Sequence, residues 1–303
     1  MQAAGILLVV IAIAGAGLWF AVRTNGPAVL DAVDQVSGGE RDVALVEQVT
    51  YGSDAAQKLR VYAPQAAAGP LPIFLFVHGG SWRSGDPDDY GFVARAIAPE
   101  GFVVVLAGYR LGVTGRYPAM LEDTAAAIAR TREIAAAHGG DPDRIIVAGH
   151  SAGAYNVAQV ALEERWLDDA GVPHRSISGV VGLSGPYDFF PFDSDSTKAA
   201  FGSVGVGAES QPVNHARADA PAMLLVHGES DTLVKPRNTR ALASQLTKAG
   251  AGAETLLYSE MDHNAPLISL ASPWRDRRDV AARIVAFAHA VSTVSVPVQD
   301  KTP

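Results

Sequence analysis

Short apolar runs alternate with alanine-rich segments along most of this 303-residue chain, and this alternation constrains the fold more than any other feature. Three of the runs, IFLFV (73–77), VVVLA (103–107) and IIVAG (145–149), are continuously apolar. Such runs are typical of strands that are covered on both faces of a sheet. We therefore expect an α/β fold with a mostly parallel, eight-stranded sheet and helices on both faces.

The predicted elements follow this alternation closely. A short polar turn, GSDAAQ (52–57), separates the first two strands, which predicts an antiparallel hairpin at one edge of the sheet. The predicted strands are Leu45–Thr50, Lys58–Tyr62, Pro72–Val77, Val103–Ala107, Arg144–Ala148, Gly179–Leu183, Met223–Val226 and Glu254–Tyr258. The predicted helices include Tyr90–Ala98, Met120–Ala137, Thr239–Ala249 and Val280–Val291.

The N-terminus carries a long uncharged segment. Residues 3–22 (AAGILLVVIAIAGAGLWFAV) would span about 30 Å as a helix, which matches the apolar core of a bilayer. We therefore predict a transmembrane anchor within residues 1–23. A cleaved signal peptide and a buried core helix are the alternatives. The anchor is favoured because no Lys or Arg precedes the apolar run and no clear A-x-A cleavage site follows it.

The remaining chain divides into three predicted parts. Residues 24–43 contain Gly, Pro and acidic residues and are predicted to be a tether, residues 44–292 form the main domain, and residues 293–303 form a tail. We expect the main domain outside the cytoplasm, although the positive-inside rule has almost no charges to count here. Secretion after signal cleavage is the alternative.

Composition excludes several classes of protein. The chain has 24 Lys and Arg against 32 Asp and Glu, a formal charge of −8, which argues against binding to nucleic acid phosphates. It contains no cysteine, so disulfides, thiolate metal sites and cysteine nucleophiles are absent. Common nucleotide and zinc motifs are also missing, and we expect no cofactor or metal. Nothing indicates the oligomeric state.

Residues 186–221 interrupt the regular alternation. This segment is too long for a plain connection and is rich in aromatic residues, Gly and Pro. Long insertions of this kind often form lids or binding walls, so we predict a cap segment here, with an ordinary surface loop as the alternative. Its aromatic residues and Trp82 are candidate substrate walls, although core packing explains them equally well; those in the segment are Tyr187, Phe189, Phe190 and Phe192.

The motif Gly149-His150-Ser151-Ala152-Gly153 is the strongest chemical signal in the chain. It is a G-x-S-x-G that directly follows a predicted strand and opens a predicted helix. A sharp strand-to-helix turn leaves space only for small neighbours, which the two glycines provide. The sequence therefore predicts Ser151 as a nucleophile at the start of the helix, where backbone amides point at its oxygen.

A serine nucleophile needs a base and an acid. Of eight histidines, His263 alone lies in a loop just after the last predicted strand, at the sheet edge where open α/β folds hold their sites. Asp231 follows the preceding strand at the same edge, with Glu229 as the nearby alternative. We predict His263 as the general base and Asp231 as its orienting partner.

Hydrogen-bond donors for a developing oxyanion are predicted in a second motif. His78-Gly79-Gly80-Ser81-Trp82 follows the strand IFLFV, and its glycines let the backbone approach a substrate carbonyl closely. The amides of Gly80, Ser81 and Ala152 are the predicted oxyanion donors.

These motifs resemble those of the α/β-hydrolase superfamily. More narrowly, HGGSW and GHSAG resemble small carboxylesterases with an HGG-type oxyanion loop, the hormone-sensitive-lipase-like and kynurenine formamidase-like groups. YRL (109–111), YPAMLED (117–123), GLSGPYD (182–188), HGESDTLV (227–234) and MDHN (261–264) extend the resemblance over most of the main domain. In the formamidase-like group the second glycine of HGG and its successor supply the oxyanion amides, which are Gly80 and Ser81 here.

The resemblance and the residues together predict a serine carboxylesterase of small carboxylic esters. Its partners would be a small-molecule ester and, through residues 3–22, a lipid bilayer. An arylformamidase or amidase would use the same residues on an amide bond, but a membrane anchor is not usual in cytosolic formamidases. A non-catalytic hydrolase-like binding module is the alternative from another class, although such modules usually lose a triad residue.

Overall fold

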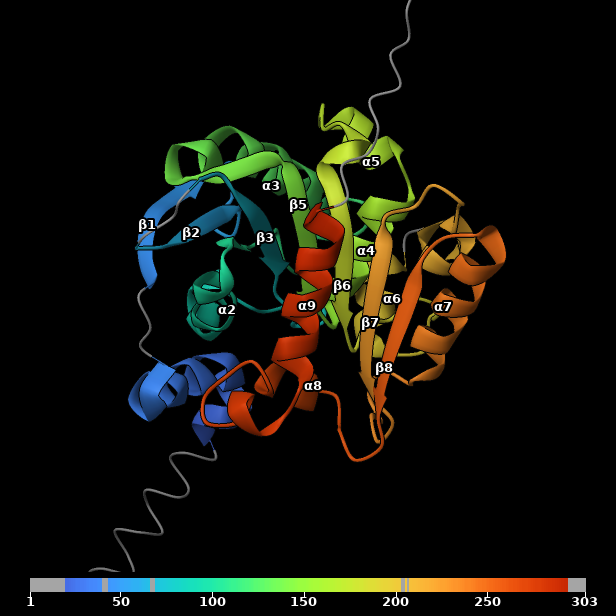
Figure 1. Cartoon of the computed structure of the whole chain (residues 1–303). Coiled ribbons are helices and arrows are strands. Elements are labelled where there is room, and N and C mark those ends of the chain that lie inside the picture. The colour runs from blue at the N-terminus through green and yellow to red at the C-terminus, as the bar shows by residue number, and fades with distance from the viewer. Residues whose placement is uncertain (1–19, 40–42, 66–68, 203–204, 206, 294–303) are drawn as a thin grey trace, which may run out of the picture.

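The chain folds around one twisted eight-stranded sheet (Figure 1). The computed structural model describes residues 20–39, 43–65, 69–202, 205 and 207–293. The strand order is β1-β2-β4-β3-β5-β6-β7-β8, in which β2 pairs antiparallel with both β1 and β4, while every other pairing is parallel. The predicted mostly parallel sheet and the edge hairpin are therefore confirmed.

All eight predicted strands are present, and most extend beyond the predicted bounds by one to four residues. The strands are β1 Val43–Thr50, β2 Lys58–Pro64, β3 Leu71–Val77, β4 Val103–Ala107, β5 Gly140–His150, β6 Ile177–Leu183, β7 Ala222–Gly228 and β8 Ala253–Tyr258. The labelled helices are α2 Gly91–Ile97, α3 Ala119–Ile134, α4 Ala152–Leu162, α5 Arg165–Asp169, α6 Asp195–Phe201, α7 Arg237–Ala249, α8 Ala265–Ile268 and α9 Val280–Thr293.

The sheet separates two apolar layers, because successive side chains of a strand point to opposite faces. On β3, Ile73, Leu75 and Val77 pack into the layer that contains α3, α4 and α7. Phe74 and Phe76 pack into the other layer, with α2, α8 and α9. Both faces are thus covered by helices, as the continuously apolar strands predicted.

Two motifs of the family resemblance serve the fold. The Arg110 guanidinium, from YRL, donates to both carboxylate oxygens of Asp123, from YPAMLED, at 2.7–3.0 Å. Gln57 Nε2 also donates to Asp123, which is 2% exposed. This buried ion pair holds the loop after β4 against α3.

The N-terminal segment forms a helix that lies against the domain. The predicted anchor, residues 3–22, falls outside the described residues except for its last three. Residues 20–34 are helical, so the predicted tether of residues 24–43 begins as a helix. In the part of the chain that the structure describes, no helix has the length and apolar character needed to cross a bilayer.

The 186–221 segment contains α6 and two short helical turns, Gly207–Ser210 and Pro212–His215. Its aromatic side chains form a cluster in the core: Phe189, Phe192 and Phe201 pack with Trp82 and Tyr155.

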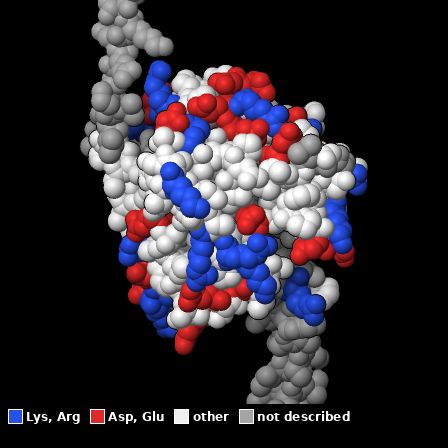
Figure 2. Space-filling model, turned by 90° about the vertical axis from the view of Figure 1, so that its right-hand side faces the viewer, with Lys and Arg blue, Asp and Glu red and all other residues white. Residues whose placement is uncertain are grey.

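The face of the molecule seen in Figure 2 carries Lys and Arg interspersed with Asp and Glu, with no continuous basic stripe.

Candidate active site

Ser151 occupies a strained turn between β5 and α4. Its backbone has φ +53° and ψ −117°, a conformation that L-residues rarely adopt. The turn is so tight that a Cβ on Gly149 would lie 2.4 Å from the Gly153 backbone, and a Cβ on Gly153 would lie 2.1 Å from the Val77 carbonyl oxygen. The two glycines of the motif are therefore required by the space available, as the sequence predicted.

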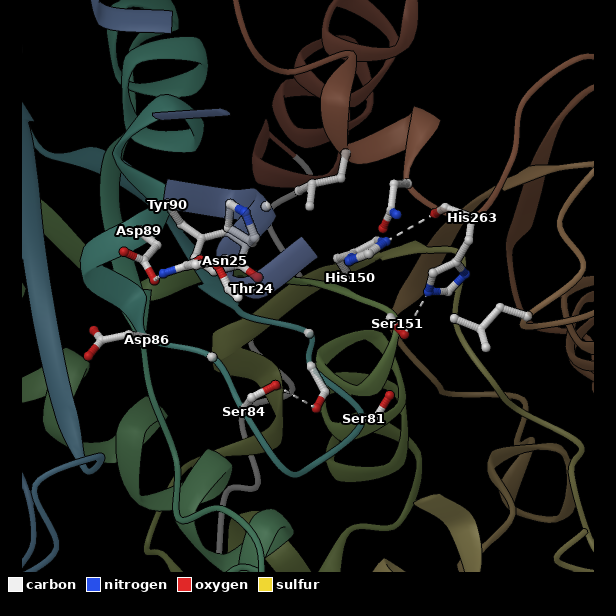
Figure 3. A pocket seen from close by; sticks show the side chains of 18 residues that line it. Thr24, Asn25, Ser81, Ser84, Asp86, Asp89, Tyr90, His150, Ser151 and His263 are labelled. Carbon is white, nitrogen blue, oxygen red and sulfur yellow. Dashed lines mark hydrogen bonds between the residues drawn. The ribbon is translucent and has the colours of Figure 1, made fainter. Parts of the chain in front are cut away.

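The structure brings Ser151, His263 and Asp231 together at the carboxyl edge of the sheet. His263 Nε2 lies 2.9 Å from Ser151 Oγ, and His263 Nδ1 lies 2.7 Å from Asp231 Oδ2 (Figure 3 shows the first contact). An ionised carboxylate only accepts hydrogen bonds, so Nδ1 carries the proton and Nε2 is free to accept from the serine hydroxyl. The three residues are 7%, 8% and 2% exposed.

Asp231 is held by four hydrogen bonds. Its Oδ2 accepts from His263 and, at 3.1 Å, from His227 Nε2, while its Oδ1 accepts from the amides of Leu233 and Val234 at 2.9 Å. Burial alone would raise the pKa of Asp231, but the hydrogen bonds from His227, His263 and the Val234 amide hold that pKa well below its ordinary value. The carboxylate therefore stays ionised beside His263.

Glu229, the alternative acid, points elsewhere. It forms an exposed ion pair with Arg240 on α7. Of these two carboxylates, it is Asp231 that contacts His263, because the turn after β7 directs the side chain of residue 231 towards the last loop and that of residue 229 towards α7.

The HGG motif forms a second strained turn beside the serine. Gly80 has φ +117°, and a Cβ there would lie 1.8 Å from the Ser84 carbonyl oxygen. Ser81 and Trp82 follow with φ +56° and +58°. Ala152 is the first residue of α4, where a helix has no carbonyl to accept its amide. These backbone positions are suited to present amides to a carbonyl oxygen bound at Ser151.

Two buried histidines brace the two turns. His78 Nδ1 donates to the Gly79 carbonyl at 2.7 Å, and His150 Nε2 donates to the His263 carbonyl at 3.1 Å. Burial lowers the pKa of His78 to about 4 and that of His150 to about 3, the latter also because of the neighbouring His263. Both rings are therefore neutral near pH 7 and act as fixed hydrogen-bond donors.

A cleft of about 430 Å³ opens above Ser151 and His263. Its walls include the HGG turn and, on the opposite side, residues 24–27 of the N-terminal helix together with Asp89 (Figure 3). Sequence reasoning did not identify residues 24–27 or Asp89, since no local motif marks them. The acidic run after HGGSW, DPDD (86–89), was the one available signal of a polar wall.

The predicted wall residues Trp82 and Tyr187 do not line this cleft. Trp82 is 4% exposed and its Nε1 donates to Asn156 Oδ1 at 3.1 Å. Tyr187 is fully buried beneath the sheet edge. Core packing, the alternative given for these two residues, explains both side chains, because their rings fill the layer that contains α4.

Searching the residues that the structure describes reveals no group of three His, Cys, Asp or Glu side chains that could hold a metal ion. The cleft brings together a hydroxyl, an imidazole, a carboxylate and backbone amides. Such a set can perform nucleophilic acyl transfer without a further group.

Known proteins share both the sequence pattern and the fold. The BD-FAE family model matches residues 59–246, more than half of the chain. Isoprenylcysteine alpha-carbonyl methylesterase from Arabidopsis thaliana is 28% identical over 80% of this chain and 61% of its own length. Esterase LipQ from Mycobacterium tuberculosis is 28% identical over 78% of this chain and 60% of its own length. The chain thus spans less than two thirds of these curated relatives.

Esterase B from Lactobacillus rhamnosis superposes with a TM-score of 0.73 over 96% of this chain and 97% of its own, at 18% identity. At that identity the superposition establishes a shared α/β-hydrolase fold. The match of the family model over residues 59–246 shows that the chain belongs to the BD-FAE family.

Proposed function

We propose that the protein is a serine carboxylesterase that hydrolyses small carboxylic esters. The single observation that carries this proposal is the continuous hydrogen-bonded line from Ser151 Oγ through His263 to Asp231, with distances of 2.9 and 2.7 Å. A serine hydroxyl becomes a useful nucleophile only when a base is placed to take its proton, and His263 Nε2 has that position.

The reaction would proceed in two acyl-transfer steps. Ser151 Oγ attacks the ester carbonyl carbon while its proton passes to His263 Nε2, and the amides of Gly80, Ser81 and Ala152 stabilise the oxyanion. His263 then returns the proton to the departing alcohol, which leaves an acyl-enzyme. Water attacks this ester by the same route, and release of the carboxylic acid restores Ser151. Asp231 stabilises the imidazolium in both steps.

The relatives support ester over amide hydrolysis. The matched curated proteins are named esterases, among them a methylesterase and, over a shorter stretch, a carboxylesterase that is 42% identical over 121 residues. None of these three proteins is named as a formamidase. We therefore assign ester bonds to this site and treat formamide hydrolysis as an outcome of the test.

The decisive experiment compares the wild type with Ser151→Ala. We expect the variant to lose turnover of p-nitrophenyl acetate and butyrate by about 10⁴-fold or more, and to lose labelling by a fluorophosphonate, while its circular dichroism stays unchanged. Unchanged hydrolysis in the variant would refute the proposal. A faster rate on N-formylkynurenine than on any ester would reassign the site to formamides, and no labelling of the wild type would favour a binding module.

We also propose that residues 3–22 anchor the protein in a bilayer with the catalytic domain outside the cytoplasm. The uncharged, 20-residue composition of this segment supports the proposal. Because the chain has no cysteine, a single Ser53→Cys variant offers a unique label at an exposed position of the main domain. We expect a membrane-impermeant maleimide to modify this cysteine in intact cells. We also expect the protein to stay in the membranes when they are washed with carbonate. Release into the wash or protection from the reagent would contradict it.

A further inference from the structure

The N-terminal helix contributes to the cleft although it lies outside the residues matched by the family model, 59–246. Residues 24–27 line the cleft on the side away from His263, next to Asp89 and Tyr90 (Figure 3). The helix lies at the end of the molecule where α8 is also found (Figure 1). Its position raises the question of what holds it there and what it adds to the site.

A buried carboxylate fastens the helix to the domain. Asp34 is fully buried, and its oxygens accept from Arg95 Nε at 2.6 Å, Arg275 Nη2 at 2.7 Å and the Ser272 amide at 2.6 Å. One helical turn earlier, Asp31 accepts from Arg95 Nη2 at 2.5 Å. Charge-assisted bonds from two distant arginines give the helix a defined place, so residues 24–27 are a fixed part of the wall.

On the cleft side, Asn25 forms the contact between the helix and the domain. Its Nδ2 donates to Asp89 Oδ2 at 2.8 Å, while its Oδ1 accepts from the Ala28 amide at 3.2 Å. Both polar ends of Asn25 are therefore oriented.

Asp89 differs from the acidic residues beside it. Asp86 and Asp88 are bonded to Lys58 at 2.7 and 3.0 Å, and Asp88 also pairs with Arg60. Among the described residues, no Lys or Arg lies within ion-pairing distance of Asp89. Its Oδ1 makes no hydrogen bond in the described part of the chain and is available as an acceptor at the cleft wall.

We propose that Asn25 and Asp89 determine specificity by binding a hydroxyl group carried by the ester substrate. A hydroxyl can donate to the carboxylate of Asp89 and accept from the carboxamide of Asn25, which an alkyl chain cannot do. An alkyl group placed there would instead bury these polar groups without partners. The inference rests on the proposed esterase activity and assigns the polar end of the cleft to the part of the substrate remote from the carbonyl.

Two matched pairs of esters test this assignment. Propyl butyrate and 2,3-dihydroxypropyl butyrate differ only in hydroxyls on the alcohol, and methyl butanoate and methyl 3-hydroxybutanoate differ only in a hydroxyl on the acyl group. In at least one pair we expect the wild type to prefer the hydroxylated ester in kcat/KM. Asn25→Leu and Asp89→Asn should each reduce that preference roughly tenfold, through KM rather than kcat.

The control is Gln35→Leu, which makes the same change on the same helix outside the cleft. Gln35 donates to Asp31 on the helix surface and does not line the cleft. We expect Gln35→Leu to keep the preference of the wild type and to hydrolyse p-nitrophenyl acetate within about twofold of the wild type. Asp89→Asn keeps the shape of the wall, so it carries the test if Asn25→Leu fails to fold.

Several outcomes would overturn the inference. A wild type that does not distinguish the esters of either pair, or variants that keep the full preference, would refute a hydroxyl-binding role while leaving the esterase proposal intact. An equal fall in kcat on all esters would show a general structural role instead. If the folded wild type hydrolyses no ester at all, including p-nitrophenyl acetate, the proposed function fails and this inference falls with it.

Discussion

The two walls of the cleft are held by different kinds of interaction. The turn wall, carried by the two turns of residues 79–85 and 149–153, is set by backbone geometry, with positive φ angles at Gly80, Ser81 and Ser151 and glycines packed against backbone atoms. The helix wall, residues 24–27, is set by side chains, through the ion pairs of Asp34 and the contact of Asn25 with Asp89.

This difference separates chemistry from selectivity. Backbone constraints act over a few neighbouring residues and hold the reacting groups within narrow limits, which acyl transfer requires. Side-chain contacts between distant segments can be changed one at a time without altering the turns. We therefore expect damage to the turn wall to affect every ester, and damage to the helix wall to affect only substrates that reach it.

The largest expected effect concerns the charge behind the turn wall. Asp231→Asn keeps the size of the side chain but removes the carboxylate that orients His263, so kcat should fall by about 10³–10⁴-fold on all esters alike. The control is Glu229→Gln two residues away, which breaks only an exposed ion pair with Arg240 and should leave kcat within about twofold. Equal losses in the two variants would show that Asp231 has no special role.

The next effect concerns the docking of the helix wall. Asp34→Asn removes the buried negative charge that Arg95 and Arg275 both contact, which typically costs about 3–5 kcal/mol. Hydrogen exchange of amides 21–34 should accelerate and the hydroxyl preference should be lost, while p-nitrophenyl acetate is still hydrolysed. Glu133→Gln, which removes an exposed pair with Arg130, should change none of these. Loss of activity on every ester in Asp34→Asn would show that the two walls do not have separate roles.

A smaller effect is expected from one added methyl group in the turn wall. Gly153→Ala places a Cβ where the Val77 carbonyl stands 2.1 Å away, so the turn must shift at a cost of about 1–3 kcal/mol in unfolding free energy. Urea unfolding measures this change. Gly69→Ala is the matched control, because no heavy atom lies within 4 Å of the added carbon there. Similar midpoints for both variants would show that the turn is not tightly packed.

The smallest effect, taken per pH unit, is a dependence of the free energy of unfolding on pH. It also belongs to the turn wall. The pKa of His78 is about 4 in the folded protein against an ordinary value of 6.5, so below pH 6.5 the unfolded chain binds a proton that the folded chain does not. The free energy of unfolding should therefore fall by about 1.4 kcal/mol per pH unit for this residue between pH 6.5 and 4. Urea titrations should show a shallower slope in His78→Gln. An unchanged slope would contradict the assigned neutral state.

Most of the fold and the reacting groups could be predicted because their signals are local. Short apolar runs, three of them continuously apolar, predicted all eight strands, and the spacing of Gly149 and Gly153 around Ser151 predicted the sharp turn that the structure contains. Asp231 and His263 could be proposed because parallel strands bring their carboxyl ends to one edge, so loops far apart in the chain meet there.

The helix wall could not be predicted, because nothing near residues 24–27 indicates a site. Asn25 meets Asp89 across 64 residues of chain, and Asp34 meets Arg275 across 241. Trp82 and Tyr187 were equally undecided, since an aromatic residue next to a motif suits a substrate wall and a core position alike. Packing between the sheet and α4 decided that both lie in the core.

The sequence by itself determined the sheet, the sharp turn at Ser151 and the residues able to react, because these depend on the period of apolar residues and on glycines at short range. Only the tertiary structure decided which surfaces enclose the cleft, which carboxylate faces His263 and where the N-terminal helix lies. These outcomes depend on the relative positions of segments that are distant in the chain, and those positions are set by long-range packing and buried ion pairs.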